Sequence, residues 1–364
     1  ARMTTTTATS HITDPGTVTR YADLPAYLHL PGAAVALGFT YWTQTSRDEP
    51  ALSSGALFIP SGATPTGGWP VIVWTHGTTG VSDSCAPSAN QDLGGYRDYL
   101  IWLLAQGYAI AATDYIGLGS PGVHPYLDGH AEAHAAIDAL RAARTINGSL
   151  SSSWAAVGHS QGGHAALFTA AIANRYAPEL DYRGAVVQAP GHSAVDTFIA
   201  VGHPGLPDIL MPQMKAYAVY MLCGVKAARP EFDLDSYLTA LGREVIADAE
   251  RLCLENMAER MAGVSIASIL SRPMAEGDFA AIARPVSDIP LTGYDRPILI
   301  TQGLLDTDCP ADSLAALILD LQANGVEFST RIYPDSDHIA VLQDSAADVH
   351  AYLDLLFARP TSGL

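Results

Sequence analysis

The sequence has few basic residues. Its 364 residues include 19 Lys and Arg, and only Lys215 and Lys226 are lysines, against 37 Asp and Glu, so the formal net charge is −18. A surface that binds nucleic acid through its phosphates needs the opposite excess, so a nucleic-acid partner is excluded and an acidic partner is disfavoured. Charged residues make up only 15% and hydrophobic residues 48% of the chain, which is too apolar for a disordered protein. We therefore expect a globular protein.

Long hydrophobic segments and cysteine motifs are also missing. The longest apolar run, residues 99–112, is interrupted by Gln106 and Gly107 and is too short to span a bilayer, so no integral membrane association is expected. The first ten residues, ARMTTTTATS, lack the charged head and apolar segment of a signal peptide. No C-x-x-C pair is present, which excludes a zinc ribbon or a thioredoxin-type motif. Two disulfides or four thiols are left for the four cysteines: Cys85, Cys223, Cys253 and Cys309.

Short apolar runs alternate with helical patterns through most of the chain. After two β-like runs at 33–45 and 56–59, the apolar runs expected to form strands are 70–76, 108–113, 154–157, 184–188, 297–302 and 326–333. The helical patterns are 96–106, 129–146, 161–176, 311–324 and 340–357. Continuous apolar strands that alternate with helices indicate a parallel sheet covered on both faces. The predicted fold class is α/β with a mostly parallel central sheet.

This alternation stops between residues 191 and 292. The stretch shows helical patterns around 208–228, 233–262 and 264–270, and it is far longer than an ordinary βα connection. It contains six of the seven methionines, which favours either an adaptable apolar pocket or ordinary gap filling between helices. The length allows two domains or one with an insertion. We predict the second: a core of residues 1–190 and 293–364, interrupted by a helical insertion at 191–292.

A candidate nucleophile lies between a predicted strand and a predicted helix. Residues 158–162 read Gly-His-Ser-Gln-Gly, a G-x-S-x-G pattern that is weak alone but specific in this position, where a sharp turn would expose the hydroxyl of Ser160. Side chains at Gly158 and Gly162 would collide with backbone at such a bend. The alternative is a glycine-rich turn with an incidental serine.

A serine nucleophile needs a base, and the base needs an orienting carboxylate. Asp306 follows the strand 297–302 at the carboxyl edge of the sheet, where ligands bind in open α/β folds, and Asp308 is the second candidate for the acid. His338 follows the last predicted strand, whereas His350 lies well inside the closing helix. The order Ser160, Asp306, His338 is that of an α/β-hydrolase.

Acyl transfer also needs backbone N–H donors for the oxyanion. The expected donors are Gln161, directly after the nucleophile, and Thr78, in the turn HGTTG after the strand 70–76, although that segment could be only a flexible turn. His130 and His134 share a helix face and could ligate zinc. Their spacing is not that of H-E-x-x-H and no third ligand is evident, so we interpret them as partly buried helix residues without a metal.

With these residues in place, the chain resembles the secretory lipase group of α/β-hydrolases. The resemblance lies in VIVWTHGTTG (71–80), DYIGLGSPGVHPYLDGHAEAHAAIDALRAAR (114–144) and VGHSQGGHAAL (157–167). It implies hydrolysis of small carboxylic esters or lipids, a helical lid in the place of residues 191–292, and no metal or organic cofactor. It also implies an exported enzyme with disulfides, with a cytoplasmic location as the alternative because no signal peptide is present.

The sequence thus predicts a serine esterase or lipase with the catalytic residues Ser160, Asp306 and His338. An acyltransferase or a peptidase could use the same triad, and a non-catalytic protein of this fold is a further alternative. For the disulfides, Cys223 with Cys253 could staple the lid and Cys85 with Cys309 could join two loops. This is one of three possible pairings.

Overall fold

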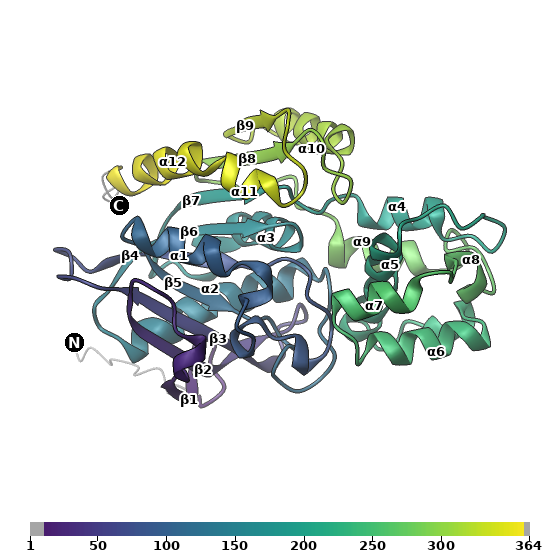
Figure 1. Ribbon diagram of the computed structural model, residues 1–364, viewed down its shortest axis with the longest axis horizontal. Coiled ribbons are helices and arrows are strands. Elements are labelled where there is room, and N and C mark those ends of the chain that lie inside the picture. Colours follow the sequence, from purple (N-terminus) through teal and green to yellow (C-terminus); the bar gives the residue numbers. More distant parts are fainter. Residues whose placement is uncertain (1–10, 360–364) are drawn as a thin grey trace, which may run out of the picture.

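The computed structural model describes residues 11–359, so the Thr-rich first ten residues lie outside the described part. Within it, nine strands form one sheet in the order β1-β2-β3-β5-β4-β6-β7-β8-β9 (Figure 1). The strands are β1 (Val18–Asp23), β2 (Ala33–Gln44), β3 (Pro50–Pro60), β4 (Trp69–Thr75), β5 (Ala109–Thr113), β6 (Leu150–His159), β7 (Asp181–Gln188), β8 (Ile298–Gly303) and β9 (Phe328–Tyr333).

The sheet is parallel from β5 to β9 and antiparallel at the edge that β1, β2 and β3 form. The inner strands β4, β5 and β8 are almost entirely buried, as expected for apolar strands covered on both faces. β1 is mostly exposed and carries polar residues, which is why no apolar run marks it in the sequence. The predicted α/β class with a mostly parallel central sheet is confirmed.

Helices cover both faces of this sheet. On one face, α2 (Gly129–Ile146), α3 (Gln161–Tyr176) and α10 (Ala311–Ala323) contribute to one apolar core. On the other, α1 (Arg97–Ala105), α11 (Ala340–Asp344) and α12 (Ala346–Ala358) contribute to a second core. The closing helix expected at 340–357 is thus two helices. They are separated at Ser345, whose buried hydroxyl donates a hydrogen bond to Gln188 Oε1 at 3.2 Å instead of facing solvent.

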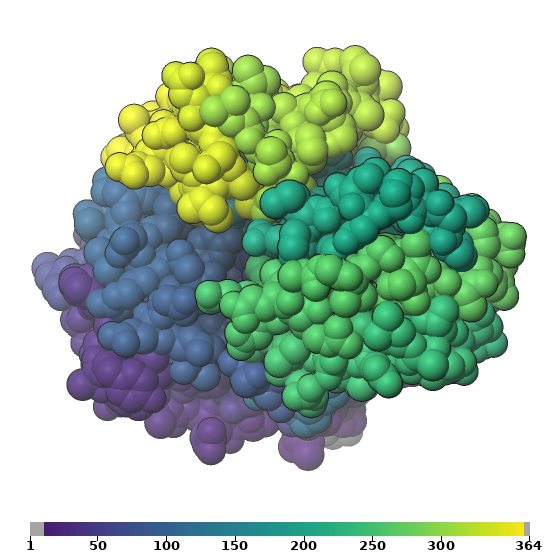
Figure 2. Space-filling model, turned by 45° about the vertical axis from the view of Figure 1, so that its right-hand side comes forward, coloured from purple at the N-terminus to yellow at the C-terminus, as the bar shows by residue number. Residues whose placement is uncertain are grey.

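The stretch 191–292 forms a lobe of helices beside the sheet, drawn in teal and green in Figures 1 and 2. Its helices are α4 (Ala194–Val201), α5 (Pro212–Ala228), α6 (Ala240–Ala249), α7 (Leu254–Met261), α8 (Ile266–Ile269) and α9 (Phe279–Ser287). They enclose an apolar cluster of their own, which Tyr126 and Leu127 of the loop before α2 join. The lobe therefore packs against the end of the sheet where β4 and β6 lead into their loops.

The disulfide pairing expected from the sequence is wrong. Cys85 is bonded to Cys253, with 5.5 Å between their Cα atoms, while Cys223 and Cys309 are free thiols. Cys223 faces the interior of the helical lobe from the middle of α5 and is 2% exposed. The start of α7 instead meets the loop after β4, where the N–H of Leu254 donates to a backbone carbonyl of that loop at 2.9 Å. The bond therefore links the lobe to the core.

Candidate active site

Ser160 lies on a sharp turn between the end of β6 and the start of α3. Its backbone has a positive φ of 61° with ψ −120°, a combination that residues other than glycine rarely adopt. A Cβ on Gly158 would come within 2.0 Å of the carbonyl oxygen of Gly162, and one on Gly162 within 1.9 Å of that of Thr75. Only glycine fits at either position, as the sequence analysis expects, so the pattern G-x-S-x-G has a steric cause here.

The structure brings Ser160, Asp306 and His338 together. The Ser160 hydroxyl donates to His338 Nε2 at 2.8 Å, and His338 Nδ1–H donates to Asp306 Oδ2 at 2.7 Å. Asp306 comes from the loop after β8 and His338 from the loop after β9, both at the carboxyl edge of the sheet. Asp308, the other candidate for the acid, lies on the opposite side of the imidazole, with Oδ2 4.0 Å from Nε2.

Asp306 is held as a carboxylate by its surroundings. Burial by itself raises the pKa of this carboxyl, but the hydrogen bond and charge of His338 and the N–H groups of Cys309 and Asp308 outweigh it, so the pKa is below its usual value. The two N–H groups donate to Asp306 Oδ1 at 2.8 Å each. The side chain therefore presents Oδ2 to the imidazole and Oδ1 to its own loop.

His159 is a neighbour of this site that the sequence does not indicate. It accepts a hydrogen bond from the Tyr96 hydroxyl at Nδ1 and donates from Nε2 to the carbonyl oxygen of His338, each at 2.7 Å. Burial and the neighbouring His338 lower its pKa to about 3, so the ring is neutral. His159 occupies a variable position of the G-x-S-x-G pattern, which carries no signal for this contact.

Thr78 and Gln161, the expected oxyanion donors, line the same cavity as Ser160. The Thr78 hydroxyl is bonded to the hydroxyl of Tyr126 at 2.7 Å. Gln161 Nε2 donates to His124 Nε2 and to Glu132 Oε1, both at 2.9 Å. Burial raises the pKa of Glu132 well above its usual value. Buried polar partners thus fix both side chains next to Ser160.

A cavity of about 360 Å³ opens beside Ser160, between the core and the helical lobe. Its walls are mainly apolar and include Leu127, Phe198, Leu210, Met214, Ala218 and Met221. A cavity of this size and polarity suits a small organic ligand. Three of the six methionines of the lobe, Met257, Met261 and Met274, are instead fully buried in its own core. Gap filling is therefore the main use of methionine here, and only Met214 and Met221 line the cavity.

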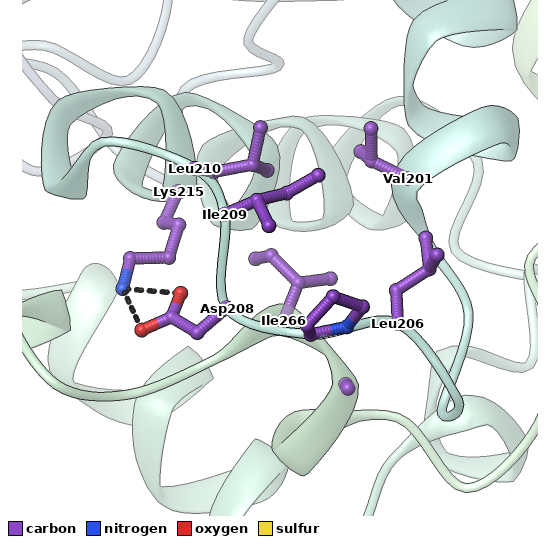
Figure 3. A pocket seen from close by; sticks show the side chains of 9 residues that line it. Val201, Leu206, Asp208, Ile209, Leu210, Lys215 and Ile266 are labelled. Atoms are coloured by element: carbon purple, nitrogen blue, oxygen red, sulfur yellow. Dashed lines mark hydrogen bonds and ion pairs between the residues drawn. The ribbon is translucent and has the colours of Figure 1, made fainter.

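The loop between α4 and α5 forms one wall of this cavity. Leu210 of this loop and Val201 at the end of α4 line the cavity, and both also line a smaller hollow that Figure 3 shows. There Lys215, 1% exposed, is paired with the two carboxylate oxygens of Asp208 at 3.0 and 3.2 Å. Asp208 itself is exposed, but it supplies the partner of the buried Lys215 ammonium and so ties the loop to α5.

Other features of the described residues concern metals and membranes. His134 is buried and stacks on Tyr176, and His130 is half-buried against Phe168, as expected for helix residues packed in this region. Across residues 11–359, no group of three or more His, Cys, Asp and Glu is placed to hold a metal ion. In the same range, every helix is too short or too polar to cross a bilayer.

The sheet is mostly parallel and covered on both faces, a serine lies on the turn after β6, and later loops supply an acid and a histidine. This is the architecture of an α/β-hydrolase. Residues 96–347 match the secretory lipase family. The chain belongs to this family of carboxylic ester hydrolases, and the resemblance seen in the sequence is confirmed.

The chain is also similar to three individual proteins. Candida antarctica lipase A in its closed state is 20% identical, with a TM-score of 0.77 over 96% of this chain and 84% of that chain. The rice cell wall degrading esterase LipA from Xanthomonas oryzae is 23% identical, with a TM-score of 0.72 over 94% of this chain and 97% of that chain. A probable inactive lipase of Mycobacterium tuberculosis is 23% identical over 94% of this chain and 79% of its own length.

Proposed function

We propose that the protein is a serine esterase or lipase that works through a Ser160-His338-Asp306 triad and an acyl-enzyme. The observation that carries this proposal is the unbroken chain of hydrogen bonds from Ser160 through both nitrogens of His338 to Asp306, at 2.8 and 2.7 Å. These are the contacts by which a serine is activated as a nucleophile.

In this mechanism Ser160 attacks the ester carbonyl while His338 Nε2 takes its proton. Asp306 keeps the ring oriented and stabilises the imidazolium. The backbone N–H groups of Thr78 and Gln161 hold the oxyanion of the tetrahedral intermediate. His338 then gives its proton to the leaving alcohol, and a water that it activates cleaves the acyl-enzyme. The scheme uses no cofactor.

We interpret the helical lobe as a lid. We propose that residues 191–292 cover a hydrolase core formed by residues 1–190 and 293–364, because the lobe supplies most of the apolar wall of the cavity next to Ser160. The substrate would be a small ester or lipid bound by apolar surface. The Cys85–Cys253 disulfide and the family favour a secreted protein, since disulfides persist outside the reducing cytosol.

A catalytically inactive protein is the competing interpretation, because one relative is described as a probable inactive lipase. The intact hydrogen-bond chain at Ser160 supports activity instead.

Ser160→Ala tests the proposal. We expect the variant to keep the melting temperature of the wild type and to lose at least a thousandfold in the hydrolysis of p-nitrophenyl butyrate. A serine-directed phosphonate should label the wild type and not the variant. Activity above about a thousandth of wild type in the variant, or no hydrolysis and no label in the wild type, would exclude this mechanism.

A further inference from the structure

The cavity beside Ser160 has charge of only one sign. Asp308 and Asp312 line it, and its wall within residues 11–359 includes no Lys or Arg. His164 and His192 also line it, but burial lowers the pKa of each to about 4, so near neutral pH they add no positive charge. A charged substrate group would therefore meet a negative field without a compensating cation.

Asp308 is fixed close to the reacting atoms. Its Oδ2 accepts hydrogen bonds from the Tyr217 hydroxyl at 3.0 Å and from Gln213 Nε2 at 2.9 Å, both on α5. The same oxygen is 4.0 Å from His338 Nε2, which is 2.8 Å from Ser160 Oγ, so it lies no more than 4.0 + 2.8 = 6.8 Å from the nucleophile. A group two or three atoms from the ester carbonyl can reach this distance.

Aromatic side chains lie in the same cavity. Tyr126, Phe198 and Tyr217 line it. Aromatic rings attract ammonium groups, and quaternary ammonium ligands are typically bound by rings of this kind. The carboxylate and the rings therefore favour the same sign of substrate charge.

We propose that Asp308 is a specificity-determining residue that makes this cavity select esters with an ammonium group in the alcohol part over neutral and anionic esters of the same shape. This inference rests on the proposed esterase function. If a unit charge on the substrate lies about 6 Å from the Asp308 carboxylate, the interaction changes the reaction rate roughly tenfold for a dielectric between those of water and protein. A cationic and an anionic ester of equal shape should thus differ by about a hundredfold.

The test compares three butyrate esters of matched shape: the choline ester, the 3,3-dimethylbutyl ester, which replaces trimethylammonium by tert-butyl, and the isethionate ester, which carries a sulfonate. Values of kcat/KM are measured by pH-stat titration for the wild type, Asp308→Asn and Asp320→Asn. Asp320 is an exposed residue of α10 outside the cavity lining, so its variant controls for the loss of one negative charge from the whole protein.

We expect the wild type to prefer choline over dimethylbutyl over isethionate. Asp308→Asn should reduce the choline-to-isethionate ratio at least tenfold, whereas Asp320→Asn should keep it. A wild-type ratio near one overturns the proposal. An equal loss of kcat/KM for all three esters in Asp308→Asn also overturns it, because this is the result expected of a residue that only holds α5 or His338 in place.

A second measurement needs no variant. Because Asp308 is 20% exposed, the wild-type ratio should fall at least threefold between 10 mM and 1 M NaCl, and a constant ratio contradicts the proposal. Failure of the esterase function itself is recognised separately. In that case none of the three esters is hydrolysed, or Ser160→Ala hydrolyses them as fast as the wild type.

Discussion

Loss of the Cys85–Cys253 disulfide should strongly destabilise the protein. The bond joins residues separated by 168 positions, so it closes a long loop of the unfolded chain. In the chain-entropy description a loop of this length corresponds to about 5 kcal/mol at 25 °C, which is an upper value if the bond strains the native state. The loop includes β5, β6, β7 and most of the lobe, so the unfolded chain gains less conformational freedom in either part while the bond is present.

The perturbation is the double variant Cys85→Ala/Cys253→Ala, and the assay is urea unfolding followed by circular dichroism. We expect the free energy of unfolding to fall by about 3–5 kcal/mol relative to the oxidised wild type. Wild type treated with dithiothreitol keeps both side chains but loses the bond, so it should approach the stability of the variant. The same treatment should leave the variant unchanged. A loss below about 1 kcal/mol in both would refute the entropic argument.

Three further predictions concern the site and its support. Gly162→Ala should prevent the turn at Ser160, because its Cβ would lie 1.9 Å from a backbone oxygen, whereas Gly148→Ala meets nothing within 4 Å and should melt like the wild type. If both variants are equally stable and active in melting and esterase assays, the steric argument fails. Asp306→Asn should lower kcat by roughly 10⁴-fold with the fold retained, and a variant with more than about a hundredth of wild-type kcat would show that another group orients His338. Burial raises the pKa of Asp138 to about 6, so the folded state binds its proton more tightly than the unfolded chain. The free energy of unfolding should then fall by about 2 kcal/mol from this residue as pH rises from 4 to 7. Asp138→Asn should remove that part of the pH dependence in urea titrations, and an unchanged pH dependence would disprove it.

Regular patterns in the sequence were sufficient to predict most of the helices and strands of the core. The predicted helices 129–146 and 161–176 coincide with α2 and α3, because each has a clear apolar periodicity next to a turn. The ends of strands are harder to predict from the sequence. The sequence predicts a strand at 154–157, but β6 spans 150–159, since residues 151–153 are polar serines and the strand is extended by the pairing of Leu150 with β4 and of Ser153 with β7. Such pairing depends on residues far away in the chain.

Part of the candidate site could also be predicted from the sequence. Ser160, Asp306 and His338 could be selected because chain order places them on loops at one edge of the sheet. The choice between Asp306 and Asp308 depends on which side of the imidazole each carboxylate reaches, and only the folded loop determines this. The disulfide was mispredicted because Cys223 and Cys253 belong to the same helical stretch of the sequence, whereas the fold places the start of α7 against the loop after β4, where Cys253 is bonded to Cys85.

The contact between His159 and the carbonyl oxygen of His338 has a consequence for how this molecule can change. His159 directly precedes Ser160, so the end of β6 holds both the nucleophile and the backbone of the histidine. The helical lobe takes no part in that contact. Residues of the lobe can therefore be exchanged, and the choice of substrate altered, while the proposed catalytic pair of Ser160 and His338 stays assembled.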